Sequence, residues 1–479
     1  DLPPATIEPQ PAGSGATFTP RMHSSEPGGA RPPRPRYAAL ASRNFRLLWS
    51  GQAISLTGTM MQNMAVLWHV SLLAPKDERA LALGYVGLAR VVPIVAFALF
   101  AGVVADAYDR RRVMLVTQSA MALCAVALAA LSIRGQATLE AVLVLTGLTA
   151  AASCFDGPAR SALVPTLVPR EHIGNAVSLN TIALQLARVI GPALAGVGIA
   201  CLDVSWIYFA NALSFVAVIA ALVHMRDLPH RPVHERAPLR IGAAFEGVRF
   251  AFTTPLLRAT MLLDFVAAFF TAATTMLPLV VQDVLQVGPI VFGWLGAAPS
   301  IGAVAASAWM VRHEHAIRRK GQVLLWAIAA FGVATVAFGL ARSVTVVFVC
   351  LAITGAADTV NMVLRSVLRQ LVTPDRLRGR MSAVNFVFSQ GGPELGEVEA
   401  GVVAQAFGVG AADQGELHAA LRTLLPITVG NMHVRPTARW DLATAIKFTN
   451  TLGYKGLYSI EVRGHEGTLA ALNTVVSAL

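Results

Sequence analysis

Four charged side chains lie inside long apolar stretches and are the residues best placed to do chemistry. Arg90 and Arg188 fall near the middle of apolar runs in the first half of the chain, and Asp264 and Asp358 fall within such runs in the second half. A charge in hydrocarbon is costly unless it is paired or reached by water, so each is a candidate for function. Opposite signs in opposite halves suit a central site that exchanges a proton for a substrate. The alternative is a structural ion pair between helices.

Neutral polar residues extend this candidate set. Gln52 belongs to a polar face of the first apolar run and Asn361 follows Asp358 by three residues, so both join the transport and proton-coupling candidates. Hydrogen-bonding groups of this kind suit a polyhydroxylated or catechol-like substrate. Asp156 and Arg160 stand four residues apart, the spacing of a local pair on one helix.

The elements that carry these residues are predicted to be membrane-spanning helices. The chain has 479 residues, of which 55% are hydrophobic and only 14% charged, whereas soluble domains carry about 25% charged residues. A helix of about twenty apolar residues crosses about 30 Å of hydrocarbon. Apolar runs predict eleven spans, at 45–73, 80–105, 113–133, 138–162, 175–200, 205–225, 256–282, 288–311, 322–341, 344–366 and 381–408.

The basic residues indicate how the chain threads the membrane. The net charge is +11, but the arginines lie in short loops, and no nucleic-acid recognition module accompanies them. Arginine concentrates in alternate loops, for example at 110–112, 226–258 and 369–380. Because cytoplasmic loops are enriched in Lys and Arg, we expect the N-terminus to be cytoplasmic.

A tight turn and two internal echoes suggest a duplicated design. Residues 102–112 read Gly-Val-Val-Ala-Asp-Ala-Tyr-Asp-Arg-Arg-Arg, and a basic turn recurs at 312–320. The segment 167–178 is echoed by 371–382, each leading into a span. Two homologous halves around a midplane site are common in secondary transporters.

These motifs resemble the major facilitator superfamily of transporters. The match to its gating turn rests on Gly102, Asp106, Arg110, Arg111 and Arg112, although Ala107 and Asp109 depart from the pattern. In that family the turn locks a cytoplasmic gate, with its acid against a helix N-terminus of the other half. Gly191, Pro192 and Gly196 resemble the antiporter signature, for which ordinary close helix packing is the alternative.

Further motifs at 155–160, 175–180 and 394–397 resemble the branch that contains the enterobactin exporter. The resemblance implies a monomeric, proton-coupled exporter of a small molecule, such as a siderophore or drug, in a bacterial inner membrane. No phosphate-binding loop for ATP occurs, and the four cysteines form no metal or disulfide pattern. We therefore expect no cofactor and no enzymatic activity.

The predicted fold is an all-α membrane protein with the major facilitator arrangement, its second half one span short, plus a small α/β-like tail. A disordered arm covers 1–36, the first half 37–225, a cytoplasmic linker 226–255, the second half 256–408 and the tail 409–479.

The tail resembles the end of sugar-phosphate isomerase and epimerase barrels. Strands are predicted at 427–434 and 456–462. The resemblance nominates His433 and Glu461 as relics of a metal site, but a barrel needs eight strand–helix units and about two are present. Two alternatives to a transporter remain, namely a barrel-type enzyme on a membrane anchor and a non-functional hybrid.

Overall fold

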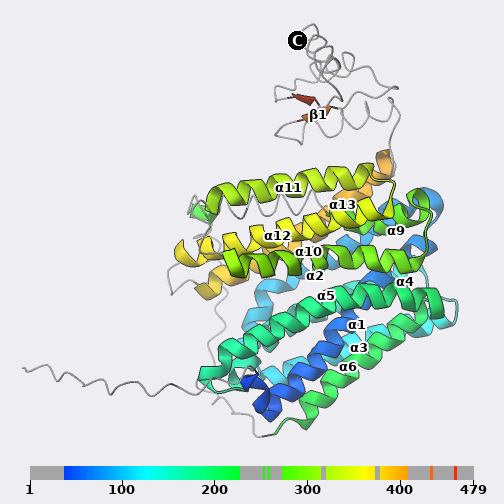
Figure 1. Cartoon of the computed structure of the whole chain (residues 1–479). Helices are drawn as coiled ribbons and strands as arrows, with labels where there is room; N and C mark the ends of the chain where they lie inside the picture. Colours follow the sequence, from blue (N-terminus) through cyan, green and yellow to red (C-terminus); the bar gives the residue numbers. More distant parts are fainter. Residues whose placement is uncertain are drawn as a thin grey trace, which may run out of the picture.

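The computed structural model describes residues 37–226, 252–253, 257–258, 261, 272–313, 320–372, 378–407, 432–434 and 458–460. Long helices dominate this part of the chain, and they lie in two groups that correspond to the predicted halves (Figure 1).

The N-terminal half contains six long helices with short 3-10 turns between them. They are α1 (Arg43–Leu73), α2 (Arg79–Ala107), α3 (Arg110–Ile133), α4 (Leu139–Leu163), α5 (Ile173–Leu202) and α6 (Val204–His224). Each lies within three residues of its predicted span at both ends. The agreement follows from the sharp change between apolar runs and charged or proline-containing loops.

The C-terminal half contains four long helices among the described residues. They are α10 (Pro289–His313), α11 (Lys320–Leu340), α12 (Val344–Val372) and α13 (Arg378–Phe407). Before them come three short helices, η6 (Ala272–Met276), α9 (Leu277–Leu279) and the π-helix η7 (Val280–Val284). Nearly half of the predicted span at 256–282 lies outside the described residues.

Eight of the helices in the described part of the chain are long and apolar enough to cross a membrane. The helices α1 and α13 are equally long but too polar to be counted with them. Two polar residues of α1, Gln52 and Gln62, are turned into the protein and are each only 5% exposed, and Glu394 and Glu397 of α13 are 19% and 15% exposed. Protein contacts rather than lipid therefore accommodate the polar side of these two helices.

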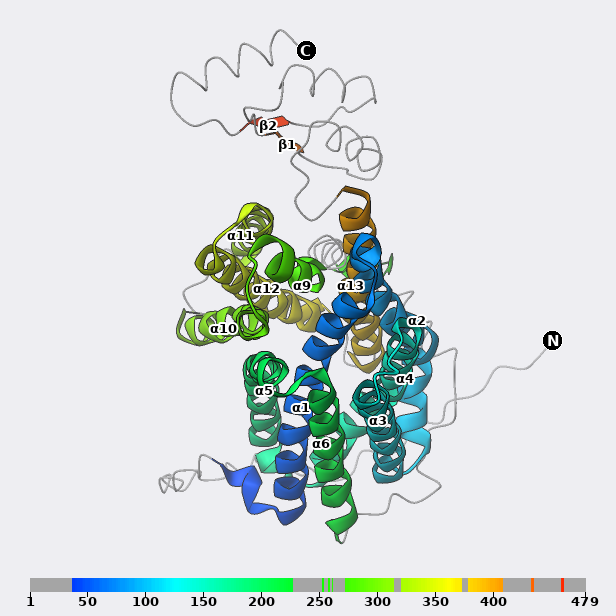
Figure 2. The same ribbon diagram turned by 90° about the vertical axis from the view of Figure 1, so that its right-hand side faces the viewer.

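Among the described residues, the two halves contact each other mainly through two helix pairs, α2 with α13 and α5 with α10. In Figure 2, α13 is seen beside α2, and α10 is seen beside α5. The largest apolar core contains residues of both halves, among them Trp68, Tyr208, Leu277 and Phe292. These residues cluster toward one end of the bundle, where the loops α1–α2 and α5–α6 lie. We call this the joined end.

At the opposite end each half has its own core. Phe45, Met114 and Leu222 belong to a cluster made only from the N-terminal half, while Met310, Leu324 and Leu364 belong to one made only from the C-terminal half. In the part of the chain that the structure describes, the halves are thus packed together at the joined end and have separate cores at the opposite end.

Two short parallel strands are described in the tail. The strand β1 (Met432–Val434) pairs with β2 (Tyr458–Ile460), with His433 opposite Ser459. Both lie within the predicted strands, and their parallel pairing agrees with an α/β fragment. Glu461 lies outside the described residues, so the metal-relic hypothesis stays a prediction.

Candidate transport site between the two halves

Small residues let α5 and α10 cross closely at the joined end. A Cβ atom added to Gly196 would lie 2.5 Å from the Pro289 carbonyl oxygen, and one added to Gly293 would lie 2.5 Å from the Pro192 carbonyl oxygen. Gly191 lies against Met60 of α1. The residues of the antiporter-like motif therefore form packing contacts here, both within the N-terminal half and between the halves.

The second crossing, of α2 with α13, is built in the same way. A Cβ atom on Gly84 would lie 3.1 Å from the Gly401 Cα, and one on Gly87 would lie 2.5 Å from both the Glu394 carbonyl oxygen and the Glu397 Cβ. Because these glycines have no side chains, α2 and α13 come close enough for Arg90, one turn beyond Gly87, to meet α13.

Arg90 meets two carboxylates of the other half at this crossing. Its Nη1 atom lies 3.8 Å from Glu394 Oε2 and 3.7 Å from Glu397 Oε2. The three side chains are only 13%, 19% and 15% exposed, respectively. The sequence singled out Arg90 as a candidate but not Glu394 and Glu397. These two could have been nominated in the same way, because they are charged residues inside the predicted span 381–408.

Arg188 and Asp358 form a second pair of opposite charges from opposite halves. Both side chains are exposed, and the Asp358 carboxylate acts electrostatically on the Arg188 guanidinium. The two residues therefore lie near each other across the boundary between the halves. This arrangement brings together two of the predicted candidates, from α5 and α12.

The α12 helix continues this polar face toward its C-terminal end. Asn361 is 5% exposed, and its Oδ1 atom has no hydrogen-bond partner. One turn further on, the Nε atom of Arg365 donates to the Asn361 carbonyl oxygen at 3.3 Å. Arg365 is 3% exposed and was not among the predicted residues, because it lies at the edge of its predicted span.

Three other predicted residues, Gln52, Asp156 and Arg160, form their hydrogen bonds within the N-terminal half and do not face the other half. The Arg160 Nη1 atom donates to Gln52 Oε1 at 2.6 Å, and Asp156 accepts from the Gln118 side chain at 2.9 Å. Gln52 therefore faces the interior of the N-terminal half. The predicted local pair between Asp156 and Arg160 is replaced by these bonds to α3 and α1, which stabilise the packing of helices against each other.

The gating turn is held by bonds within the N-terminal half. Asp109 caps α3 by accepting from the Arg112 backbone N–H at 3.1 Å. Arg110 donates to the Ala162 carbonyl at 2.6 Å and Arg111 to the Val223 carbonyl at 3.1 Å. The side chain of Asp106 lies outside the described residues, as do Asp264 and most of the second basic turn at 312–320, and Gly102 is placed only as part of α2.

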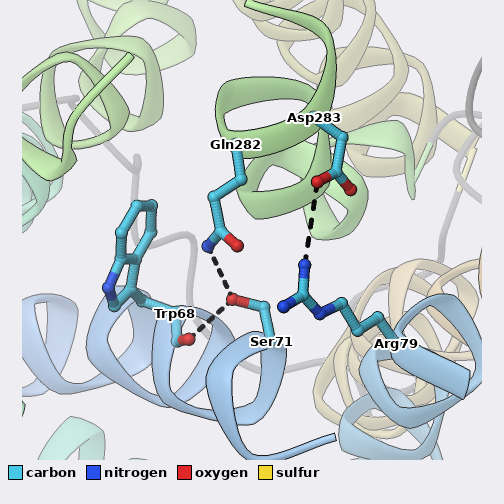
Figure 3. A network of polar contacts seen from close by, with 5 residues as sticks. All are labelled: Trp68, Ser71, Arg79, Gln282 and Asp283. Carbon is cyan, nitrogen blue, oxygen red and sulfur yellow. Dashed lines mark hydrogen bonds and ion pairs between the residues drawn. The ribbon is translucent and has the colours of Figure 1, made fainter. Parts of the chain in front are cut away.

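Polar contacts close the joined end between the halves (Figure 3). The Gln282 side chain donates to the Ser71 hydroxyl at 2.9 Å, and Arg79 Nη1 lies 3.7 Å from Asp283 Oδ1. The Gln405 side chain donates to the Asp77 carbonyl oxygen. Beside them Trp68 packs against Phe292, with ring centroids 5.0 Å apart. Every one of these contacts joins the α1–α2 region to the C-terminal half.

The sequence is similar to that of known exporters. It is 25% identical over 341 residues to the enterobactin exporter EntS of Escherichia coli O1:K1, covering 71% of this chain and 80% of that protein. It is also 25% identical over 375 residues to the staphyloferrin A transporter of Staphylococcus aureus, covering 76% and 90%.

The fold is that of solved membrane transporters. A bacterial homologue of the lysosomal transporter Spinster, in an inward-facing and unoccupied conformation, matches 91% of this chain and 92% of its own with a TM-score of 0.61 at 13% identity. The inward-facing bacterial homologue of ferroportin matches 76% and 97% with a TM-score of 0.53 at 16% identity.

The family comparison covers nearly the whole chain. Residues 35–453 match the family described as transmembrane secretion effectors, a match that begins just before the first described helix and extends into the tail. With two homologous helical halves, spans of the expected length and charges facing each other between the halves, the chain belongs to this family of major facilitator transporters.

Proposed function

We propose that the chain exports a small anionic or polyhydroxylated molecule of the siderophore class from the cytoplasm in exchange for protons. The proposal adds a substrate class and a coupling ion to the membrane transporter described above. It places the chain as a monomer in a bacterial inner membrane, with its N-terminus cytoplasmic.

The observation that carries this proposal is the pair Arg188 and Asp358. One residue comes from each half, both side chains are exposed, and their charges act on each other. An arginine between the halves offers several fixed donors to a carboxylate or catecholate group of a substrate. A carboxylate beside it is able to accept a proton when the substrate leaves.

The substrate class is supported by the relatives rather than by the site itself. Two transporters with 25% identity carry the names of siderophores, enterobactin and staphyloferrin A. Such molecules are rich in oxygen atoms. Their anionic groups suit Arg188, and their hydroxyl groups are able to donate to the unpartnered amide oxygen of Asn361, which lies one turn beyond Asp358 on α12.

The proposed orientation is compatible with export, because it lets a substrate enter the site from the cytoplasm. With a cytoplasmic N-terminus, α1 runs outward, so the joined end is the outer one. The cytoplasmic side is then the end at which the halves have separate cores, and a substrate reaches Arg188 from the cytoplasm.

Proton-driven transport in inverted membrane vesicles tests the proposal. Uptake of a radiolabelled catecholate siderophore should depend on an imposed proton gradient and should be abolished by Asp358→Asn, because the amide takes up no proton. Glu171→Gln serves as a matched control, since the Glu171 side chain is 70% exposed and lies in the loop before α5. Normal gradient-driven uptake by Asp358→Asn would exclude Asp358 as the coupling acid.

A further inference from the structure

The contact of Arg90 with Glu394 and Glu397 is unbalanced in charge. One guanidinium faces two carboxylates, and the two carboxylates repel each other. Two carboxylates that share a buried site do not both stay ionised at low cost, and pairs of this kind commonly share one proton. When both carboxylates are ionised, the site carries a net negative charge and is therefore able to bind one more positive charge.

The buried polar atoms of this cluster also lack partners. Arg90 Nη2, Glu394 Oε2 and Glu397 Oε2 are buried without a hydrogen bond. Thr275 of η6 is only 1% exposed; its hydroxyl is directed at Glu397, yet it meets no partner with hydrogen-bond geometry. Buried polar groups are normally satisfied, and a proton on one of the two carboxylates would turn an orphaned acceptor oxygen into a donor for a neighbouring acceptor.

The cluster exists only while α2 and α13 touch. Arg90 comes from the N-terminal half and both glutamates from the C-terminal half, and Gly87 allows the close approach. If the halves separate at the joined end, each carboxylate regains water and loses its neighbour in the other half. The affinity of the site for a positive charge is thereby tied to the position of the halves.

We propose that Arg90, Glu394 and Glu397 form a proton-binding site that holds one proton while α2 and α13 are in contact and releases it when they separate. One carboxylate oxygen takes up the proton as an O–H group. That group donates to the other carboxylate or accepts from Thr275, while Arg90 neutralises the remaining negative charge. On separation the proton returns to water.

The other groups near the pair do not supply the missing charge. In the described part of the chain, α2 contributes Arg90 and η6 contributes the neutral Thr275. Glu399 stands two residues beyond Glu397 on α13, which places it on another face of the helix. Arg79, at the start of α2, is paired with Asp283.

The inference rests on the proposed function only in needing two halves that alternate between contact and separation. Because its proton is released as the joined end opens, this site is separate from the proton exchanged for substrate at Asp358. The proposal fixes the direction in which contact between the halves changes with pH. Proton uptake favours contact, so contact at the joined end should be complete at low pH and should be lost as pH rises. For one proton, the ratio of joined to separated molecules changes by at most about tenfold per pH unit.

Distance measurements on the full chain test this linkage without substrate. Spin labels at Arg134→Cys and Arg342→Cys report on the joined end, since both residues are exposed and lie in the α3–α4 and α11–α12 loops. The background has its four native cysteines replaced by alanine. Either Glu394→Gln or Glu397→Gln leaves one carboxylate for one arginine, so each should keep the halves joined at every pH.

Glu399→Gln is the matched control on the same helix and should keep the wild-type pH dependence. Infrared difference spectra between low and high pH give a second readout, in which the wild type should show a protonated carboxyl band that is missing from both single variants. Wild-type pH dependence in both variants, or no such band in the wild type, would overturn the proposal. Neither readout needs transport, so failure of the proposed substrate leaves this result standing.

Discussion

Arg90 and Arg188 are two intramembrane arginines with different surroundings. Arg90 is nearly buried and meets two carboxylates of α13, whereas Arg188 is exposed and faces the single carboxylate of Asp358. A buried arginine with two fixed partners suits a contact that holds helices together. An exposed arginine with one partner is available to a molecule that enters between the halves.

Removing Arg90 should destabilise the protein strongly. Arg90→Leu leaves Glu394 and Glu397 buried without a countercharge, and breaking such a contact costs about 3–5 kcal/mol. The triple variant Arg90→Leu, Glu394→Gln, Glu397→Gln removes the stranded charges and should recover most of that loss. Thermal unfolding in detergent measures both, and a triple variant no more stable than Arg90→Leu would contradict an electrostatic cause.

The individual charges were predictable from sequence, but their pairing was not. Arg90, Arg188 and Asp358 stand out because a charge inside an apolar run is rare. The contact between Arg90 and Glu394 joins residues about three hundred positions apart, and it depends on which faces of α2 and α13 cross. Gln52 shows the opposite case, since a polar residue near the middle of a span bonds inside its own half.

Among the helices, the two crossings between the halves share one construction. Glycine backbones meet at α5–α10 through Gly196 and Gly293, and at α2–α13 through Gly84 and Gly401. Small residues allow helices in a membrane to approach closely, so that backbone and side-chain dispersion contacts replace the missing hydrophobic driving force.

A larger side chain at Gly196 should force α5 and α10 apart. Gly196→Val meets the Pro289 carbonyl oxygen and Gly293, and overpacking of this kind costs about 1–3 kcal/mol. Gly174→Ala is the control on the same helix, because nothing lies within 4 Å of its added Cβ atom. Unfolding temperatures should fall for Gly196→Val only; equal effects of both changes would show that helix α5, not the crossing, is sensitive.

Helix bounds follow from the sequence more readily than helix neighbours. The α5 and α6 helices match their predicted spans to within two residues, because loops interrupt the apolar runs abruptly. From the sequence, Gly191, Pro192 and Gly196 could be either an antiporter signature or residues of ordinary close helix packing. Only the position of α10 shows that the motif meets a glycine of the other half.

Over the whole molecule, contact between the halves is concentrated at one end. Among the described residues, the Ser71–Gln282 hydrogen bond and the Arg79–Asp283 ion pair (Figure 3), a bond from Gln405 and a shared apolar core join them there, while the opposite end has separate cores. A membrane transporter built this way changes access by separating one end and joining the other.

A covalent link across the joined end should therefore stop transport. Ser71→Cys and Gln282→Cys replace two side chains whose polar atoms lie 2.9 Å apart, and a short bifunctional thiosulfonate should join them in a cysteine-free background. Vesicle transport should be lost on linking and should return with reductant. Each single-cysteine variant, treated identically, should transport normally; continued transport by the linked protein would show that this end need not open.

The division into halves was predictable, whereas the state of the molecule was not. The echo of 167–178 at 371–382 indicates two related halves, and their helices α5 and α13 do occupy equivalent places as partners of the opposite half. Which end is joined depends on the balance of many small contacts such as Ser71 with Gln282. No local sequence pattern encodes that balance.

The polar character of α1 has a consequence for how the protein is made. Its buried Gln52 and Gln62 bond to Arg160 and Asn211, residues of α4 and α6 that leave the ribosome long after α1 does. A polar side chain without a hydrogen-bond partner is energetically unfavourable in the hydrocarbon core of a membrane. We therefore expect the first helix to remain beside the insertion machinery, or in water at its margin, until the sixth helix is made. Assembly of this half is then completed only when its last helix is inserted. If translation stalls before Asn211, Gln62 of the first helix lacks its hydrogen-bond partner.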